Sequence, residues 1–202
     1  MEEVVSSADL FQRLSATYDG ESLCLHKRAA EAVNAIKDEG FAKISKDVRQ
    51  KGFADEYEVQ QFILERFKQE GMVTDSAPIV AIGKNANSPH YEPTDENHSL
   101  IKKGDLVLID LWEKYDRPDA VFADITWMGY VGSAVPAAVQ KVFDTVKTAI
   151  DRALAFLERE LPRRDVCGYE VDDVCNRYMT EQGYGEYIVH RTGHSISLGE
   201  SD

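Results

Sequence analysis

Residues 104–115 read GDLVLIDLWEKY, and residues 120–132 read AVFADITWMGYVG. Both stretches are rich in Val, Ile, Leu and aromatic residues, a composition typical of β-strands. The DRPD sequence at residues 116–119 favours a turn, because proline presets the backbone angle and aspartate bonds its own backbone. We therefore predict that the two stretches form an antiparallel pair of strands.

Helical periodicity precedes this strand pair. Residues 26–48 place apolar side chains on one helical face, although Gly40 weakens the middle of the segment. Residues 55–71 show the same spacing, with Asp55 suited to the N-cap and Gly71 to the C-terminal stop. A short apolar strand is predicted at residues 77–83, and a polar loop follows it.

Two further helices are predicted after the strand pair. Pro136 suits the first turn of a long amphipathic helix, and Pro162 ends it. A shorter helix over residues 169–182 ends at Gly183, and residues 185–198 are interpreted as strand or loop. Helices, strands, helices and a final strand in this order predict an α+β domain.

Charge and composition restrict the possible classes of function. The chain has 202 residues and a formal net charge of −13, which repels phosphate backbones and argues against nucleic-acid binding. No apolar run approaches the ~20 residues of a membrane span, and residues 1–11 lack the features of a secretory signal. Three cysteines without a close pair fit a reducing compartment. We expect a cytoplasmic protein that binds neither nucleic acid nor a membrane.

Asp110 and Asp124 are the first candidates for chemistry. Each interrupts an apolar strand sequence, where a carboxylate is costly unless it is paired, hydrogen-bonded or bound to a metal ion. If the strands pair across their turn, both carboxylates reach one site, and a divalent cation relieves their repulsion. The alternative is that each aspartate caps a strand end or accepts backbone hydrogen bonds.

Histidines supply further candidates. His190 and His194 are four residues apart, so they share a face on a helix and on a strand alike. An imidazole beside carboxylates suits zinc, manganese, cobalt or iron, although a lone histidine more often satisfies a local hydrogen bond. His90 lies in a proline-flanked loop, where it suits proton transfer or a substrate contact. His26 and His98 have polar neighbours and are expected on the surface.

Other reactive-site motifs are missing from the sequence. Residues 83–88 lack the pattern of a P-loop, and no G-x-G-x-x-G occurs. Ser195 and Ser197 lie near the histidines, but there is no G-x-S-x-G elbow. Cys167 and Cys175 are too far apart for a C-x-x-C metal site, so we expect them to be packing residues.

Several motifs, taken together and in order, resemble one family of metallopeptidases. The motifs are SPHYEPT at residues 88–94, KKGDLVLIDLW at 102–112, FADITWMGYVG at 122–132 and HRTGHSIS at 190–197. They resemble methionine aminopeptidase, aminopeptidase P and prolidase, and most of all the last two. The resemblance begins at about Glu31 and implies a pita-bread (creatinase/aminopeptidase) fold, in which helices cover an antiparallel sheet. It also implies two metal ions held by two aspartates, one histidine and two glutamates.

The resemblance assigns roles to five residues of this chain. Asp110 and Asp124 match the two aspartate ligands, and His194 matches the histidine ligand. His90 matches a histidine that contacts substrate, and His190 matches one that lines the site in the proline-specific branch. In such enzymes the metal ions generate a hydroxide that attacks a peptide carbonyl, and they stabilise the oxyanion.

The chain also departs from the family pattern. Trp112 stands where the family usually has glycine, Trp127 and Met128 replace a common Arg-Thr, and Ser197 occupies another expected glycine position. The stretch between the two aspartates is longer than usual. None of these changes removes a ligand, but they leave the substrate subclass open.

The two glutamate ligands are expected to be missing. Only Glu200 follows His194, and it is too close in sequence to be either of them. We expect a single incomplete catalytic-type domain: an N-terminal extension over residues 1–21, the first half of the fold over 22–165 and the start of the second half over 166–202. With three ligands of five, it is expected to bind at most one divalent ion.

The resemblance implies a fragment of an Xaa-Pro metallopeptidase. Such a hydrolase, an aminopeptidase or dipeptidase, cleaves a peptide bond near proline or a related small amide. The alternative is a non-catalytic pita-bread module that binds peptides or proteins; retention of Asp110, Asp124 and His194 argues against it. With the second half missing, the sheet is expected to have an uncovered apolar face or edge, which predicts a homo-oligomer. The expected partners are a peptide or small-amide substrate and further copies of the chain.

Overall fold

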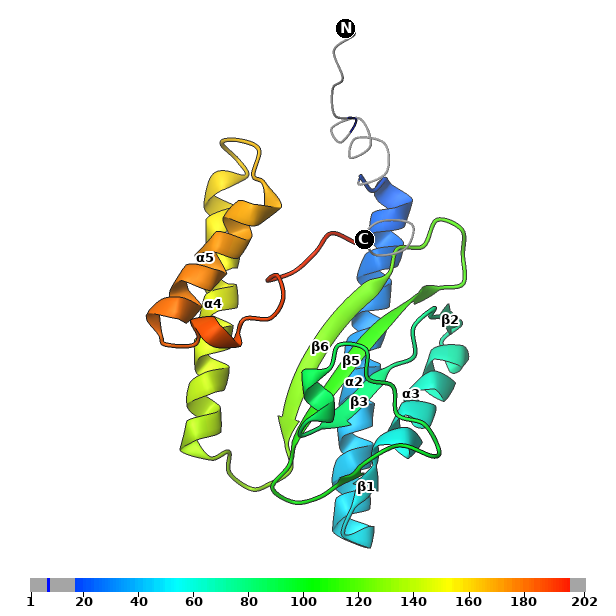
Figure 1. The fold of residues 1–202 in the computed structure, drawn as a ribbon. Coiled ribbons are helices and arrows are strands. Elements are labelled where there is room, and N and C mark those ends of the chain that lie inside the picture. Colours follow the sequence, from blue (N-terminus) through cyan, green and yellow to red (C-terminus); the bar gives the residue numbers. More distant parts are fainter. Residues whose placement is uncertain (1–6, 8–16, 197–202) are drawn as a thin grey trace, which may run out of the picture. The chain divides into compact units, whose positions relative to one another are not determined.

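A computed structural model describes residue 7 and residues 17–196 (Figure 1). The chain forms two compact units: the first runs to Ser133 and includes Ile196, and the second spans Ala134–Ser195. Ser197 and Glu200 lie outside the described residues. Within the described ranges, no helix is both long and apolar enough to cross a membrane.

Two helices form one layer of the first unit. α2 spans Gly20–Lys51, and the Asp19 side chain caps it by accepting a backbone hydrogen bond from its first turn. α3 spans Glu56–Gln69, and the Asp55 side chain accepts two backbone hydrogen bonds from its first turn, which confirms the predicted N-cap. Gly71, two residues past the helix, has a φ of 70°, a left-handed conformation that glycine adopts at no steric cost.

The strands of the first unit form an antiparallel sheet around β5. β5 pairs with three other strands, which confirms the predicted hairpin with β6. The four strands are β2 (Met72–Val73), β3 (Ile79–Ile82), β5 (Leu106–Tyr115) and β6 (Ala123–Tyr130). A separate two-stranded ladder joins β1 (Ala54–Asp55) to β4 (Leu100–Ile101).

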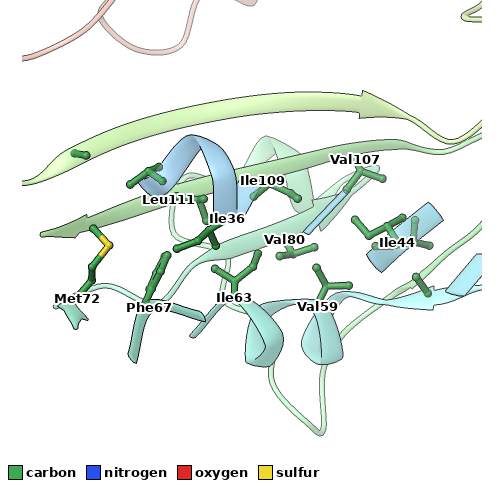
Figure 2. Close-up of a cluster of buried hydrophobic side chains, with 14 of the residues drawn as sticks. Ile36, Ile44, Val59, Ile63, Phe67, Met72, Val80, Val107, Ile109 and Leu111 are labelled. Carbon is green, nitrogen blue, oxygen red and sulfur yellow. The ribbon is translucent and has the colours of Figure 1, made fainter. Parts of the chain in front are cut away.

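The hydrophobic core lies between this sheet and the two helices (Figure 2). α2 packs on β5 and β6, and α3 packs on β3. A Cβ added to Gly40 of α2 would lie 3.3 Å from Ile109 Cδ1 and 3.4 Å from Ile63 Cδ1. The glycine that weakens the helical pattern therefore lets the helix approach the sheet closely. The cluster includes Val33, Ile36 and Ile44 of α2, Val59, Ile63 and Phe67 of α3, and Val107, Ile109 and Leu111 of β5.

The second unit contains two packed helices. α4 spans Ala137–Glu160, directly after Pro136, and α5 spans Gly168–Glu181; both agree with the predicted elements. They pack through small residues of α4 against Cys175, whose Sγ donates to Ala149 O at 3.2 Å. A short 3-10 helix, η2 (Gly185–Tyr187), follows α5, and residues 188–195 of this unit form a loop.

The sequence pattern did not determine which face of α4 is covered, and one packing expectation in this unit, that for Cys167, is wrong. The apolar stripe of α4 is largely exposed. Between 41% and 53% of the surface of each of its residues is exposed, in Val142, Phe143, Val146, Ile150 and Leu154. α4 instead buries Thr145, Ala149 and Ala153. Cys175 is the buried packing residue that was predicted, but Cys167 is exposed at the N-cap of α5.

Candidate metal centre

Asp110 and Asp124 lie on the same face of the β5–β6 pair. Asp110 is directly opposite Thr126, and Asp124 is directly opposite Trp112. Residues that face each other across an antiparallel pair point to the same side, as do alternate residues along one strand. The two aspartates are therefore diagonal neighbours across the strand pair. The Cα atoms of such neighbours are about 7–8 Å apart. We call the side that these four residues share the aspartate face.

The other side of the same strands explains why the aspartates lie in apolar sequences. Ile109 and Leu111 flank Asp110 in sequence and point into the core, while Asp110 itself is half-buried. Asp110 lies in the middle of β5, so it does not cap a strand end. Thr126 Oγ1 donates to Asp110 Oδ1 at 2.9 Å, and this bond orients the carboxylate on the aspartate face.

Trp112, which replaces a family glycine, is held firmly on the aspartate face. Its ring stacks on Phe122, with centroids 4.3 Å apart and planes 9° apart. Its indole Nε1 donates to Asp75 Oδ1 at 2.9 Å. Directly opposite Asp124, the indole gives the aspartate face an apolar border that a glycine would not provide.

Glu113 is a buried acid that was not among the predicted site residues. It is 0% exposed, and neither carboxyl oxygen has a hydrogen-bond partner among the described residues. Burial, and then the charges of Asp124 and Asp110, raise the pKa of Glu113 to about 9, so it is protonated at neutral pH. The alternation that points Ile109 and Leu111 inward also points Glu113 inward, so the strand pattern contained the signal.

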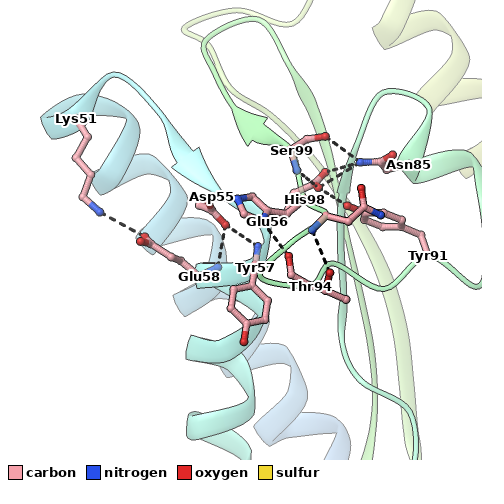
Figure 3. A network of polar contacts seen from close by, with 11 residues as sticks. Lys51, Asp55, Glu56, Tyr57, Glu58, Asn85, Tyr91, Thr94, His98 and Ser99 are labelled. Carbon is pink, nitrogen blue, oxygen red and sulfur yellow. Dashed lines mark hydrogen bonds and ion pairs between the residues drawn. The ribbon is translucent and has the colours of Figure 1, made fainter.

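His90 is exposed in the long connection between β3 and β4. This connection contains a short 3-10 helix, η1 (Asn85–Asn87). Tyr91, the next residue, donates from its hydroxyl to Glu56 Oε2 at 2.6 Å (Figure 3). The chain beside His90 is therefore tied to the first residue of α3.

His98 and His26, which were expected on the surface, are half-buried, and each contacts a backbone carbonyl of the first unit. His98 Nδ1 lies 2.9 Å from Thr94 O, and His98 Nε2 lies 2.8 Å from Asp55 Oδ2. A carbonyl and a carboxylate oxygen only accept, so the protonated ring, which donates from both nitrogens, satisfies both contacts. The bond to Thr94, and then the charge of Asp55, accordingly raise the pKa of His98. His26 is half-buried, with Nδ1 2.8 Å from Phe122 O.

His190 and His194 lie in the loop of the second unit, and both are exposed. His190 Nδ1 lies 2.7 Å from Arg191 O, and His194 Nδ1 lies 3.0 Å from Ser195 O. Because a carbonyl oxygen only accepts, Nδ1 carries the proton in each neutral ring. Nε2 then carries the lone pair, which is the tautomer that a metal ligand at Nε2 requires.

Asp172 of α5 anchors the segment between these two histidines. Its Oδ1 accepts hydrogen bonds from Thr192 N at 2.8 Å and from Thr192 Oγ1 at 2.7 Å. The backbone bond, and then the hydroxyl bond, lower the pKa of Asp172. Asp172 and Thr192 are 20 residues apart, and no local motif in the sequence connects them.

The structure brings two of the five predicted site residues together. Asp110 and Asp124 share the aspartate face of the first unit, while His190 and His194 belong to the second. In the part of the chain that is described, no group of three or more His, Cys, Asp or Glu side chains could hold a metal ion. The three-residue ligand set therefore stays a prediction. The residue types of each part fit a divalent cation, because carboxylate and imidazole groups are common metal ligands.

Known proteins share both sequence and fold with this chain. Residues 25–201 match the model of metallopeptidase family M24. An uncharacterised peptidase of Staphylococcus saprophyticus is 29% identical over 178 residues, which cover 87% of this chain and 45% of the relative. The structure of an X-Pro aminopeptidase from Thermotoga maritima is 26% identical with a TM-score of 0.75, covering 96% of this chain and 51% of that chain. A prolidase from Thermococcus sibiricus is 26% identical with a TM-score of 0.72, covering 96% and 50%.

These matches confirm the resemblance and the pita-bread fold that it implied. The antiparallel sheet and its covering helices align with about half of the prolidase and aminopeptidase structures. The chain likewise spans about half the length of the curated relative. The match to the family model covers most of the chain, including all five predicted site residues. The chain belongs to the metallopeptidase family M24.

Proposed function

We propose that this chain is part of a metal-dependent peptidase whose complete form hydrolyses peptide bonds next to proline. The observation that carries the proposal is the placement of Asp110 and Asp124 on one face of β5 and β6. Membership of a metallopeptidase family and likeness to an X-Pro aminopeptidase and a prolidase support it. Because the chain spans about half of these relatives, the activity is proposed for the whole protein.

In this proposal, Asp110, Asp124 and His194 hold one divalent ion, either manganese, zinc, cobalt or iron. Two carboxylates and one imidazole form an open ligand set, as in catalytic sites that leave a position for water. A divalent ion there supplies Lewis acidity, which makes water a nucleophile near neutral pH. Thr126 keeps the Asp110 carboxylate oriented. His90 and His190 contact the peptide and transfer protons.

Metal binding by the 202-residue chain tests this proposal. Isothermal titration calorimetry with Mn²⁺ is expected to give a stoichiometry of one bound ion per chain. Asp110→Asn and Asp124→Asn each remove a charged ligand and should weaken binding at least about tenfold, since even residues that only support ligands have effects of that size. Asp119→Asn, an exposed aspartate in the turn between the strands, is the matched control. Two ions per chain, or full affinity in both ligand variants, would contradict the proposal.

Hydrolysis separates the enzyme from the alternative, a peptide-binding module. The complete protein is expected to release the residue before proline from an Xaa-Pro peptide in the presence of Mn²⁺. It should lose this activity in Asp124→Asn. Saturable peptide binding without any hydrolysis would instead favour the module.

We also propose that copies of the chain associate. The five exposed apolar side chains of α4 support this, because contiguous apolar surface drives association. Sedimentation at micromolar concentration is expected to show a dimer or a larger species. A monodisperse monomer would contradict it.

A cytoplasmic location completes the proposal. Cys24, Cys167 and Cys175 are free thiols, and the first two are exposed. Exposed free thiols are compatible with a reducing compartment. Cell fractionation that recovers the protein outside the cytoplasm would contradict this location.

A further inference from the structure

Glu56 is a buried carboxylate whose hydrogen-bond donors come from a distant segment. It is the first residue of α3 and is 0% exposed. Its Oε1 accepts from Ile82 N at 2.7 Å, and its Oε2 accepts from the Tyr91 hydroxyl at 2.6 Å. Oε2 also accepts from Ser99 N at 2.7 Å and from Asn85 Nδ2 at 3.2 Å. These four donors all lie between the end of β3 and the start of β4.

The donors of the connection lie on both sides of His90 in sequence. Asn85 precedes His90, Tyr91 follows it directly, and Ser99 ends the connection. Asn85 Nδ2 also donates to Ser99 Oγ at 3.0 Å, so the two ends of the connection meet beside the carboxylate. Apart from η1, the backbone of the connection has no regular helix or strand. A loop of this kind needs side-chain bonds to hold one conformation, because ordering it costs conformational entropy.

The anchor suits a carboxylate and no other side chain of this size. Two carboxylate oxygens only accept, which matches a set of groups that only donate here. A charged acceptor forms stronger hydrogen bonds than a neutral one, and the first turn of a helix favours negative charge. Glutamine would keep one acceptor and turn an amide N–H group toward the donors. Burial, and then the bond to Glu56, raise the pKa of Tyr91, so its hydroxyl keeps the proton that it donates.

We propose that Glu56 is a positioning residue for His90. Through Tyr91 and Asn85, its carboxylate holds the chain around His90 in the conformation that meets the substrate. The inference rests on the proposed function, in which His90 contacts the peptide. Glu56 itself is buried and acts only through the connection.

Hydrogen–deuterium exchange of the metal-free, substrate-free chain tests the anchor directly. Glu56→Gln is expected to speed amide exchange in residues 83–99 at least tenfold, and Tyr91→Phe to speed it only around residues 88–93. Glu58→Gln is the control, because Glu58 is an exposed acid in the same helical turn. Unchanged exchange in the connection overturns the proposal, as does an equal increase throughout the first unit. If Glu56→Gln does not fold, unchanged exchange in Tyr91→Phe overturns it alone.

A double-mutant cycle on the peptidase activity tests whether the anchor acts through His90. Tyr91→Phe is expected to lower kcat about tenfold with little change in KM, and to cause no further loss in a His90→Ala background. Equal losses in both backgrounds overturn the proposal. Absence of hydrolysis by the wild-type protein counts against the proposed function instead, and the exchange experiment then still decides whether Glu56 holds the connection.

Discussion

Replacing Glu113 by glutamine removes an ionisable group from the core of the first unit with almost no change in shape. Glu113 is fully buried without a hydrogen-bond partner among the described residues, and its pKa is raised from 4.5 to about 9. Between these two values the folded chain keeps a proton that the unfolded chain releases. The stability that this group contributes is therefore fully present below the unfolded pKa, and it is lost as the pH rises toward the folded pKa.

The size of the effect follows from this difference in proton binding. Each pH unit above the unfolded pKa costs the wild-type protein about 1.4 kcal/mol of unfolding free energy. pH 7 lies about 2.5 units above that pKa, so Glu113→Gln is expected to be about 3 kcal/mol more stable there. The advantage should shrink to less than about 1 kcal/mol at pH 5, where the unfolded carboxyl is also partly protonated. The buried amide and the buried protonated carboxyl bury similar polar groups, so that contribution largely cancels.

Urea unfolding between pH 5 and pH 8 measures the effect. Both tryptophans, Trp112 and Trp127, lie on β5 and β6, so their fluorescence reports on the first unit. Glu31→Gln on the exposed side of α2 controls for the loss of one negative charge. A stability difference between Glu113→Gln and wild type that is the same at both pH values would refute the reasoning. A variant less stable than wild type at pH 7 would refute it as well.

Asp55→Asn should lower the pKa of His98, because the carboxylate 2.8 Å from Nε2 loses its charge while asparagine still caps α3. The pKa of His98 is raised in the folded chain, so its stabilising contribution is complete below the unfolded pKa and is lost as the pH rises through the folded pKa. An NMR titration that gives the same His98 pKa in Asp55→Asn and in the wild type would disprove the ion pair. Gly129→Ala places a Cβ 2.5 Å from Phe41 Cε1, and overpacking of this kind costs about 1–3 kcal/mol. The Tm of Gly129→Ala should fall below that of Gly20→Ala, because nothing lies within 4 Å of a Cβ added at Gly20. Equal Tm values for the two variants would contradict the clash. Ile150→Lys should shift the chain toward monomer in sedimentation, whereas Lys147→Ala on the same helix should not; no shift would exclude α4 as the association surface.

The larger elements of the fold were predictable because each one repeats its pattern several times. β5 shows alternation over ten residues, and α4 shows helical periodicity over 24. β1, β2 and β4 have two residues each, too few for any period, and only pairing with a distant strand defines them. The exposure of the α4 stripe was also beyond prediction, because an amphipathic pattern indicates which face is apolar but not whether anything covers it.

The residues of the candidate site were likewise only partly predictable from the sequence. Asp110 and Asp124 were found because each breaks an apolar run and because the hairpin fixes their register. Glu113 was missed because it follows the run instead of interrupting it, although strand alternation places it on the core side. The ion pair of His98 was not predicted from its polar neighbours, since its partner, Asp55, lies 43 residues away in sequence. Contacts over such separations leave no local pattern.

Glu56 and Glu113 show that the partners of a buried acid, and not its burial, determine its role. Both are 0% exposed. Glu56 accepts hydrogen bonds from four donors, three of them in the connection that carries His90, whereas Glu113 has no hydrogen-bond partner in the described part of the chain. The same substitution by glutamine should therefore have opposite effects. At Glu56 it removes an acceptor that several donors need, so it loosens the connection. At Glu113 it removes only the tendency to ionise in an apolar environment, so it stabilises the fold.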